Sequence, residues 1–261
     1  MDFSTLNGVI LDMDGVLWLG DQPLPGMQDL FEFFRSNNIR FVLATNNSAK
    51  SPADYVAKLA RMGVQGVDEA QIVTSGIAAV NYLQTRYPAG MNIHVLGGDG
   101  LKALVTKAGY VLADDAEVVV AGIDTALTYE KLKRAAMLIR KGAVFIGTNA
   151  DVTIPTPEGL APGAGSILAA LQAATDCEPI IMGKPNAPMF EAALRALNTD
   201  AIHALMIGDR LQTDILGAQN VGIRAALVLT GVATEADLKT SPIQPDVVYS
   251  GLPALIAAWS A

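Results

Sequence analysis

Residues 8–17 read Gly-Val-Ile-Leu-Asp-Met-Asp-Gly-Val-Leu, and the predicted fold is organised around this stretch. Its apolar beginning predicts a buried strand that ends at the glycine in position 15. Side chains two residues apart on an extended chain point to the same side, so the carboxylates of Asp12 and Asp14 converge on one site. Because unpaired burial of two acids is unfavourable, we expect them at a solvent-accessible rim or beside a cation. An ordinary strand-to-turn junction is the alternative interpretation.

The composition is typical of a well-packed globular protein with one or two domains. Apolar residues make up 51% of the 261 residues and charged residues 17%, which excludes a disordered chain. The net charge of −8 argues against nucleic acid or an anionic membrane as the main partner. The single cysteine, Cys177, fits a reducing compartment. Neither a signal peptide nor an apolar run of roughly 18 residues is present, so we expect a cytoplasmic protein.

Short β-branched runs alternate with longer helical segments, and this alternation predicts a doubly wound α/β fold with a parallel sheet. Residues 87–90, Tyr-Pro-Ala-Gly, are the best candidate for a hinge. A second series of strands and helices follows, and the first pattern resumes with a strand at residues 179–182. We therefore predict a discontinuous catalytic core of residues 1–88 and 179–261, interrupted by an inserted α/β cap of residues 89–178. A single continuous sheet is the alternative.

Four strands of this predicted core end in polar residues. These residues are Asp12 and Asp14, then Thr45, Asn46 and Asn47, then Lys184, then Asp209. Because ligands of open parallel sheets bind at the carboxyl ends of the strands, we expect these side chains to meet at one rim. Three carboxylates suit Mg²⁺, which takes oxygen ligands together with substrate phosphate. The hydroxyl, amide and ammonium groups suit a phosphate, so the set predicts phosphoryl chemistry.

The two aspartates of the first strand end have different predicted roles. A carboxylate that attacks a phosphate ester meets like-charge repulsion, so a magnesium ion and the lysine are both needed nearby. We expect Asp12 to be the nucleophile that forms an aspartyl-phosphate. Asp14 is expected to protonate the leaving alkoxide and then to deprotonate the attacking water. Acid–base assistance of this kind is typically worth about 10²–10⁴-fold in rate.

Each of these residues also has a purely structural interpretation. The run Thr45-Asn46-Asn47 is typical of a helix cap. Lys184 lies between glycine and proline, as an exposed turn lysine would. Asp209 and Asp214 are typical of a turn and of the first turn of a helix. The joint order of these residues along the chain, each at a strand end, favours the functional interpretation.

Several motifs of the chain match one family. They are LDMDGVLWLG, VLATNNS, IMGKPNAPMF and MIGDRLQTDILGA, together with TNAD, PGAGS and LTGV. With these motifs the chain resembles the haloacid dehalogenase superfamily and, within it, the NagD-like phosphatases, which include p-nitrophenyl-phosphatase and pyridoxal-phosphate-phosphatase types. The resemblance implies a Rossmann-like core, an α/β cap of the C2 type between the second and third motifs, and a Mg²⁺-dependent phosphatase that acts on small phosphomonoesters.

The resemblance also implies roles for individual residues. Mg²⁺ would be held by the side chains of Asp12 and Asp209 and by the backbone carbonyl of Asp14, with Asp214 supporting these ligands from behind. The motif of residues 45–47 and Lys184 would bind the phosphate. Relatives dimerise through the cap, and we carry that over as an expectation.

The sequence leaves the substrate open. Trp18 and the Pro/Gly-rich passage of residues 148–165 are candidates for substrate contact, and packing at a domain interface is the alternative for Trp18. Residues 149–155 contain polar Asn149, Asp151 and Thr153 but no arginine, which favours a sugar phosphate, a phosphoglycolate-like compound or an aryl phosphate over a nucleotide.

Three other functions use related chemistry. A phosphoryl-accepting signalling or binding protein needs neither Asp14 nor a large cap, so the chain disfavours it. A dehalogenase is disfavoured because its chemistry uses no magnesium site. A phosphomutase stays open, because the same intermediate can return its phosphoryl group to a sugar phosphate.

Overall fold

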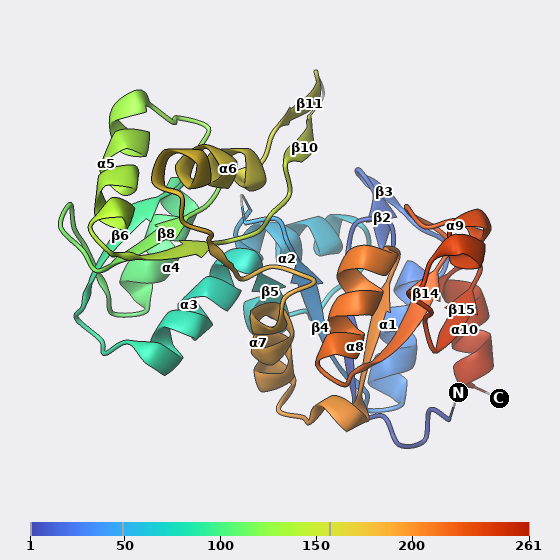
Figure 1. The fold of residues 1–261 in the computed structure, drawn as a ribbon. Helices are drawn as coiled ribbons and strands as arrows, with labels where there is room; N and C mark the ends of the chain where they lie inside the picture. Colours follow the sequence, from blue (N-terminus) through green and yellow to red (C-terminus); the bar gives the residue numbers. More distant parts are fainter. Residues whose placement is uncertain (1, 49, 157, 261) are drawn as a thin grey trace. The chain divides into compact units, whose positions relative to one another are not determined.

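The computed structural model describes residues 2–48, 50–156 and 158–260. The chain clusters into two compact units (Figure 1). The first unit contains Met1–Thr45, Pro52–Val73 and Met189–Ala261. The second contains Asn46–Ser51 and Thr74–Pro188.

A six-stranded sheet forms the centre of the first unit. Its strand order is β15-β14-β13-β1-β4-β5, and β1 pairs in parallel with β13 on one side and with β4 on the other. Parallel pairing continues from β13 to β14 and from β14 to β15. This topology confirms the predicted doubly wound α/β fold. The strands are β1 (Gly8–Leu11), β4 (Arg40–Thr45), β5 (Ile72–Thr74), β13 (Ala204–Gly208), β14 (Arg224–Val228) and β15 (Val247–Tyr249).

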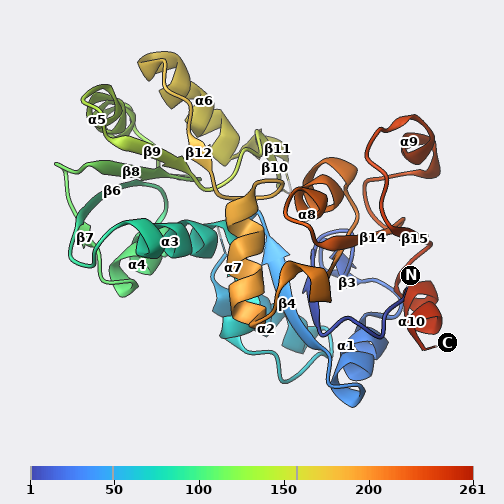
Figure 2. The ribbon, with the colours of Figure 1, turned by 60° about the horizontal axis from the view of Figure 1, so that its bottom comes forward.

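Helices cover both sides of this sheet. Figure 2 shows α7 and α8 on one side and α1 and α10 on the other. The apolar stripe of α1, with Leu30, Phe31 and Phe34, packs against Val9 and Leu11 of β1 in one buried cluster. Of the helices in the described ranges, none is long and apolar enough to cross a membrane. The helices are α1 (Met27–Ser36), α2 (Pro52–Arg61), α7 (Ala187–Leu197), α8 (Leu216–Asn220), α9 (Glu235–Thr240) and α10 (Leu252–Trp259), with short helical turns at Glu69–Gln71, Ala201–His203 and Leu211–Ile215.

A five-stranded parallel sheet forms the centre of the second unit, in the order β12-β9-β8-β6-β7. Its core is a separate cluster in which Val119 and Ala121 of β8 pack with Leu138 of α5 and Leu168 of α6. The strands are β6 (Asn92–Leu96), β7 (Val111–Leu112), β8 (Val118–Ala121), β9 (Val144–Gly147) and β12 (Ile180–Ile181). The helices are α3 (Ser75–Arg86), α4 (Asp99–Lys107), α5 (Tyr129–Arg140) and α6 (Ala164–Thr175).

The strand at Ile180–Ile181 corrects one prediction. The sequence predicts that this strand resumes the first sheet, but it pairs with β9, so that Ile180 lies opposite Ile146. Helix α3 likewise contacts α4 and belongs to the second unit. The second unit therefore extends beyond the predicted limits of residues 89–178 at both ends. A two-residue strand has too short a pattern to specify its sheet, so the neighbouring strand decides where it pairs.

Two antiparallel hairpins lie in stretches that are rich in proline and glycine. The first joins β2 (Trp18–Leu19) to β3 (Gln22–Pro23), with Trp18 opposite Pro23. The second joins β10 (Thr153–Thr156) to β11 (Gly159–Pro162), inside the passage of residues 148–165. The strands of both hairpins are difficult to predict from the sequence, because prolines and glycines normally mark the ends of strands.

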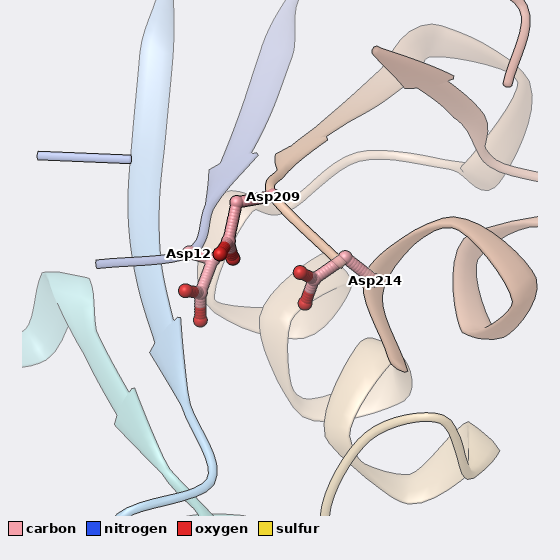
Figure 3. Close-up of side chains that lie close together, drawn as sticks. All are labelled: Asp12, Asp209 and Asp214. Atoms are coloured by element: carbon pink, nitrogen blue, oxygen red, sulfur yellow. The ribbon is translucent and has the colours of Figure 1, made fainter. Parts of the chain in front are cut away.

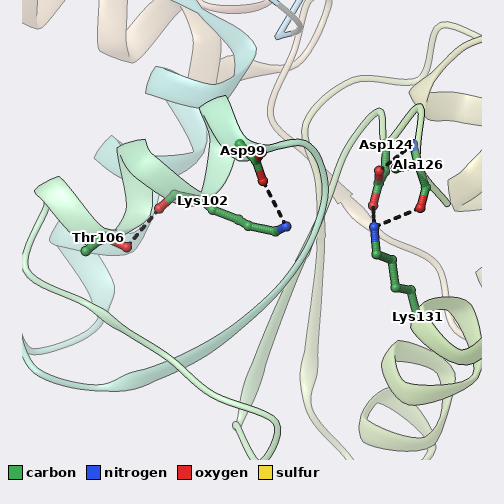
Figure 4. A network of polar contacts seen from close by, with 6 residues as sticks. All are labelled: Asp99, Lys102, Thr106, Asp124, Ala126 and Lys131. Carbon is green, nitrogen blue, oxygen red and sulfur yellow. Dashed lines mark hydrogen bonds and ion pairs between the residues drawn. The ribbon is translucent and has the colours of Figure 1, made fainter. Parts of the chain in front are cut away.

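Polar contacts support two helices of the second unit (Figure 4). The buried carboxylate of Asp124 accepts hydrogen bonds from Lys131 Nζ at 2.8 Å and from the backbone N–H of Ala126 at 2.9 Å. Burial acts to raise the pKa of Asp124, but the hydrogen bonds from Lys131 and Ala126, together with the charges of Lys131 and Lys102, outweigh burial and hold the pKa below its ordinary value. In the other pair of Figure 4, Lys102 contacts an exposed Asp99 at 3.2 Å.

Replacing Asp124 by asparagine should lower the free energy of unfolding by about 1 kcal/mol at neutral pH, because a charged hydrogen-bond partner is lost. Since the folded-state pKa is lowered, this stabilisation is complete above the ordinary value of 3.8 and is lost as the pH falls through the folded-state value. Urea unfolding of both proteins at pH 7 and at about pH 3 measures the difference. The matched variant Asp99→Asn should change the free energy by less than about 0.5 kcal/mol. An equal loss at both pH values would contradict the assignment.

Candidate functional site

Asp12 and Asp209 follow two neighbouring strands, β1 and β13, in the middle of the first sheet. From β1 the chain builds the sheet outward through β4 and β5, and later from β13 outward through β14 and β15. The boundary between β1 and β13 is therefore the topological switch point, where open α/β sheets bind their ligands. The backbone N–H of Asp12 donates to the carbonyl of Ile207 at 2.9 Å, so the pairing of the two strands continues up to the site.

Three carboxylates converge beyond this switch point, those of Asp12, Asp209 and Asp214 (Figure 3). One carboxylate oxygen from each residue lies within 4.8 Å of the other two. Asp209 and Asp214 are fully buried, and Asp12 is half-buried. Like charges at such separations in a desolvated site repel unless a cation or a shared proton compensates them. Because all three donors are hard carboxylate oxygens, the set fits a divalent cation such as Mg²⁺.

Backbone N–H groups orient the two buried carboxylates. Asp209 Oδ2 accepts a hydrogen bond from the N–H of Val232 at 2.8 Å. Asp214 Oδ2 accepts one from the N–H of Arg210 at 3.1 Å. The second contact spans the turn Leu211–Ile215, which is π-helical rather than α-helical, and such turns are frequent at functional sites. This turn places the Asp214 side chain in the cluster itself.

Three glycines allow the chain to approach these carboxylates closely. A Cβ at Gly15 or at Gly231 would overlap the carboxylate of Asp209, and a Cβ at Gly208 would overlap the side chain of Asp214. Gly15 also has a φ of +90°, which strongly favours glycine. Gly15, which follows Asp14, is therefore required both by its backbone conformation and by the close approach of the Asp209 carboxylate.

Asp14 lies apart from the three-carboxylate cluster. Its side chain is exposed, and its Oδ1 accepts a hydrogen bond from Trp18 Nε1 at 2.9 Å. Tyr55 of α2 is buried nearby, and burial raises the pKa of its phenol, with further raising by the carboxylate of Asp14. Tyr55 is therefore neutral at physiological pH. The metal contact expected through the Asp14 carbonyl stays a prediction.

The predicted phosphate ligands divide between the units. Thr45 is the last residue of β4 and is buried in the first unit, whereas Asn46, Asn47 and Lys184 belong to the second. The side-chain amide of Asn46 pairs with the backbone of Lys184: its Oδ1 accepts from the N–H at 2.7 Å, and its Nδ2 donates to the carbonyl at 3.1 Å. A Cβ at Gly183 would come within 2.7 Å of that Oδ1, so a glycine precedes the lysine.

Two further residues hold Asn46 in place. Asn149 Nδ2 donates to the carbonyl of Asn46 at 2.7 Å, and Ser75 Oγ donates to the same carbonyl at 2.6 Å. From the sequence, Asn149 is expected to act only in substrate choice, although it belongs to the TNAD motif. Nothing in the pattern singles out Ser75, because its role depends on a partner 29 positions away.

Comparison with known proteins gives a consistent result. A family model described as haloacid dehalogenase-like hydrolase matches residues 9–111, and one described as HAD-hydrolase-like matches residues 181–255. The acid sugar phosphatase of Staphylococcus haemolyticus is 36% identical over 252 residues, which are 96% of this chain and 95% of that protein. The solved 4-nitrophenylphosphatase from Thermotoga maritima is 39% identical, with a TM-score of 0.92 over 98% of each chain. NagD from Escherichia coli K-12 is 28% identical, with a TM-score of 0.89 over 95% of this chain and 97% of that one.

Replacing Gly231 by alanine should lower the free energy of unfolding by about 1–3 kcal/mol, because the added methyl group displaces the buried carboxylate of Asp209. Urea unfolding measures this change. The matched control is Gly100→Ala in α4, where nothing lies within 4 Å of the added carbon. That control should be neutral or stabilising by up to about 1 kcal/mol. Equal stability of the Gly231 variant and the parent protein would contradict the packing argument.

Proposed function

The chain belongs to the haloacid dehalogenase-like hydrolase family and is a phosphatase that hydrolyses phosphoric monoesters, and we propose that Asp12 is its nucleophile. One observation carries this assignment. Of the three clustered carboxylates, Asp209 and Asp214 are fully buried, and Asp12 is the one that keeps part of its surface accessible. Asp12 is therefore the clustered carboxylate that a substrate can reach.

The proposed metal is Mg²⁺. Phosphatases of this family generally use a divalent metal, and the carboxylates of Asp12 and Asp209 supply the hard oxygen donors that it prefers, with the carboxylate of Asp214 close by to support them. The backbone carbonyl of Asp14 is the further ligand that we assign. A bound divalent cation would neutralise charge on the carboxylates and on the phosphate, so that a carboxylate can approach the phosphorus.

The reaction that we assign to these residues has two steps. In the first, an oxygen of Asp12 bonds to phosphorus while the bond from phosphorus to the ester oxygen breaks, and Asp14 gives its proton to the departing alkoxide. In the second, Asp14 takes a proton from water as that water attacks the aspartyl-phosphate, which releases phosphate and restores Asp12. The exposed position of Asp14, outside the three-carboxylate cluster, supports its separate role as acid and base.

The phosphate donors in this proposal are Thr45, Asn46, Asn47 and Lys184. The pairing between Asn46 and the backbone of Lys184 supports the assignment, because it fixes the base of the lysine side chain beside an amide. Asn149 and Ser75 would act indirectly by holding the carbonyl of Asn46. Preorganised donors of this kind stabilise charge that develops on the phosphoryl oxygens.

Asp12→Asn should lower kcat for p-nitrophenyl phosphate by about 10³-fold or more, because the amide cannot form the acyl phosphate. Release of p-nitrophenolate with Mg²⁺, and with a chelator in its place, measures the loss and the metal requirement together. The exposed Asp29 provides a matched control, and Asp29→Asn should keep full activity. Mass spectrometry of the acid-quenched parent enzyme should locate phosphate on the peptide that contains residue 12. Activity that survives in Asp12→Asn would overturn the nucleophile assignment.

The proposed substrates are small phosphomonoesters, with sugar phosphates and aryl phosphates preferred over nucleotides. The names of the acid sugar phosphatase and 4-nitrophenylphosphatase relatives support this class, as does the lack of arginine and lysine in residues 149–155. In a phosphate-release panel, kcat/KM for the best sugar phosphate should exceed that for nucleoside monophosphates by about tenfold, or 1.4 kcal/mol of transition-state binding. A preference for nucleotides would contradict the proposal. A cytoplasmic location and a dimer formed through the second unit stay predictions.

A further inference from the structure

We propose that Trp18 is a positioning residue for Asp14: its indole N–H holds the Asp14 carboxylate in the orientation that proton transfer needs. The inference rests on the acid–base role proposed for Asp14. The hydrogen bond joins Trp18 Nε1 to Asp14 Oδ1 at 2.9 Å, which is the usual length for an N–H donor. The indole nitrogen can only donate, so this contact has one direction.

The two partners differ in how firmly they are held. Asp14 is exposed, and an exposed aspartate side chain has several rotamers available to it. Trp18 is fully buried, so its ring has no such freedom. A hydrogen bond from an immobile donor to a mobile carboxylate selects one orientation of that carboxylate. The contact engages Oδ1, and we assign the proton transfer to Oδ2.

The backbone around Trp18 fixes the ring relative to Asp14. The N–H of Gly15 donates to the carbonyl of Trp18 at 2.8 Å, and the N–H of Trp18 donates to the carbonyl of Met13 at 3.3 Å. Trp18 also begins the β2–β3 hairpin, opposite Pro23. The segment that carries the donor is therefore closed onto the segment that carries the acceptor.

A lysine from another element holds the ring from its face. Lys58 Nζ, on α2, lies 4.2 Å from the centroid of the Trp18 ring and is buried with it. The same ammonium donates to the carbonyl of Gly20 at 2.6 Å and lies 3.7 Å from Asp21, so it also ties down the hairpin. A cation over the indole face draws electron density from the ring, which strengthens the N–H as a donor.

Packing alone is the competing explanation for a buried tryptophan, and leaving-group chemistry separates the two. Phenolate is a poor leaving group and needs its proton as the bond to phosphorus breaks, whereas p-nitrophenolate leaves readily as an anion. A misoriented Asp14 should therefore slow phenyl phosphate far more than p-nitrophenyl phosphate. The comparison uses kcat/KM, because that constant covers the steps up to departure of the leaving group. A packing defect would not distinguish two substrates of such similar shape.

The experiment compares Trp18→Phe with the parent enzyme on these two substrates, with Mg²⁺ present. The phenylalanine keeps an aromatic ring beneath Lys58 but removes the N–H donor. We expect kcat/KM to fall by about 10–100-fold for phenyl phosphate and by less than about threefold for p-nitrophenyl phosphate. The matched control is Trp259→Phe, because Trp259 stacks on Phe3 and meets Phe33 edge to face in the first unit, and this variant should leave both constants unchanged.

Two further variants make the outcomes distinct. An equal loss for both substrates, or no loss for either, in Trp18→Phe would overturn the positioning role. Asp14→Asn tests the premise separately: if it keeps full activity on phenyl phosphate, the acid–base role of Asp14 itself is wrong. Should Trp18→Phe fail to fold, Lys58→Met is the second test, because it loosens the ring without removing the N–H. A selective loss of kcat/KM for phenyl phosphate in that variant supports the proposal, and an equal fold-change for both substrates, or no change for either, overturns it.

Discussion

Mutual repulsion among the carboxylates of Asp12, Asp209 and Asp214 is the constraint on which the site depends. Three such groups within 4.8 Å, two of them fully buried, are tolerated only where charge is compensated. The sheet places Asp12 and Asp209 at its switch point, where the neighbouring strands β1 and β13 end. Backbone N–H groups donate hydrogen bonds to the buried carboxylates of Asp209 and Asp214. Gly15 and Gly231 leave room for the Asp209 carboxylate, which a Cβ at either position would displace.

Sequence patterns could predict the parts of this site that are local. The strand before Asp12 and the strand before Asp209 are uniformly buried runs followed by an acid, and the structure has both as expected. The position of Asp214 among the clustered carboxylates could not be predicted in the same way. It depends on a π-helical turn at Leu211–Ile215, whereas the sequence there is typical of the first turn of an ordinary helix.

Non-local pairing explains the remaining differences. The strand Ile180–Ile181 is read correctly as a strand, but its two residues carry no information about which sheet it joins. Lys184, three residues later, therefore belongs to the second unit together with Asn46, although the sequence assigns both to the core. Asn46 directly follows Thr45 at the end of β4, so adjacent residues of one motif belong to different units. The polar pattern identifies these residues as candidate ligands, but the tertiary contacts determine the unit to which each belongs.

Two aspartates that stand two positions apart thus come to have opposite surroundings. Asp12 shares a largely buried cluster with two other carboxylates and fits a cation, whereas Asp14 is exposed. Two groups near Asp14 are neutral: Trp18 donates through an uncharged indole, and burial raises the pKa of the Tyr55 phenol further above physiological pH. The nearby cation, Lys58, lies over the indole ring, with the ring's N–H making the contact to the carboxylate. The acid and base role that we propose for Asp14 fits such neighbours, because the indole N–H orients the carboxylate without placing a charge beside it.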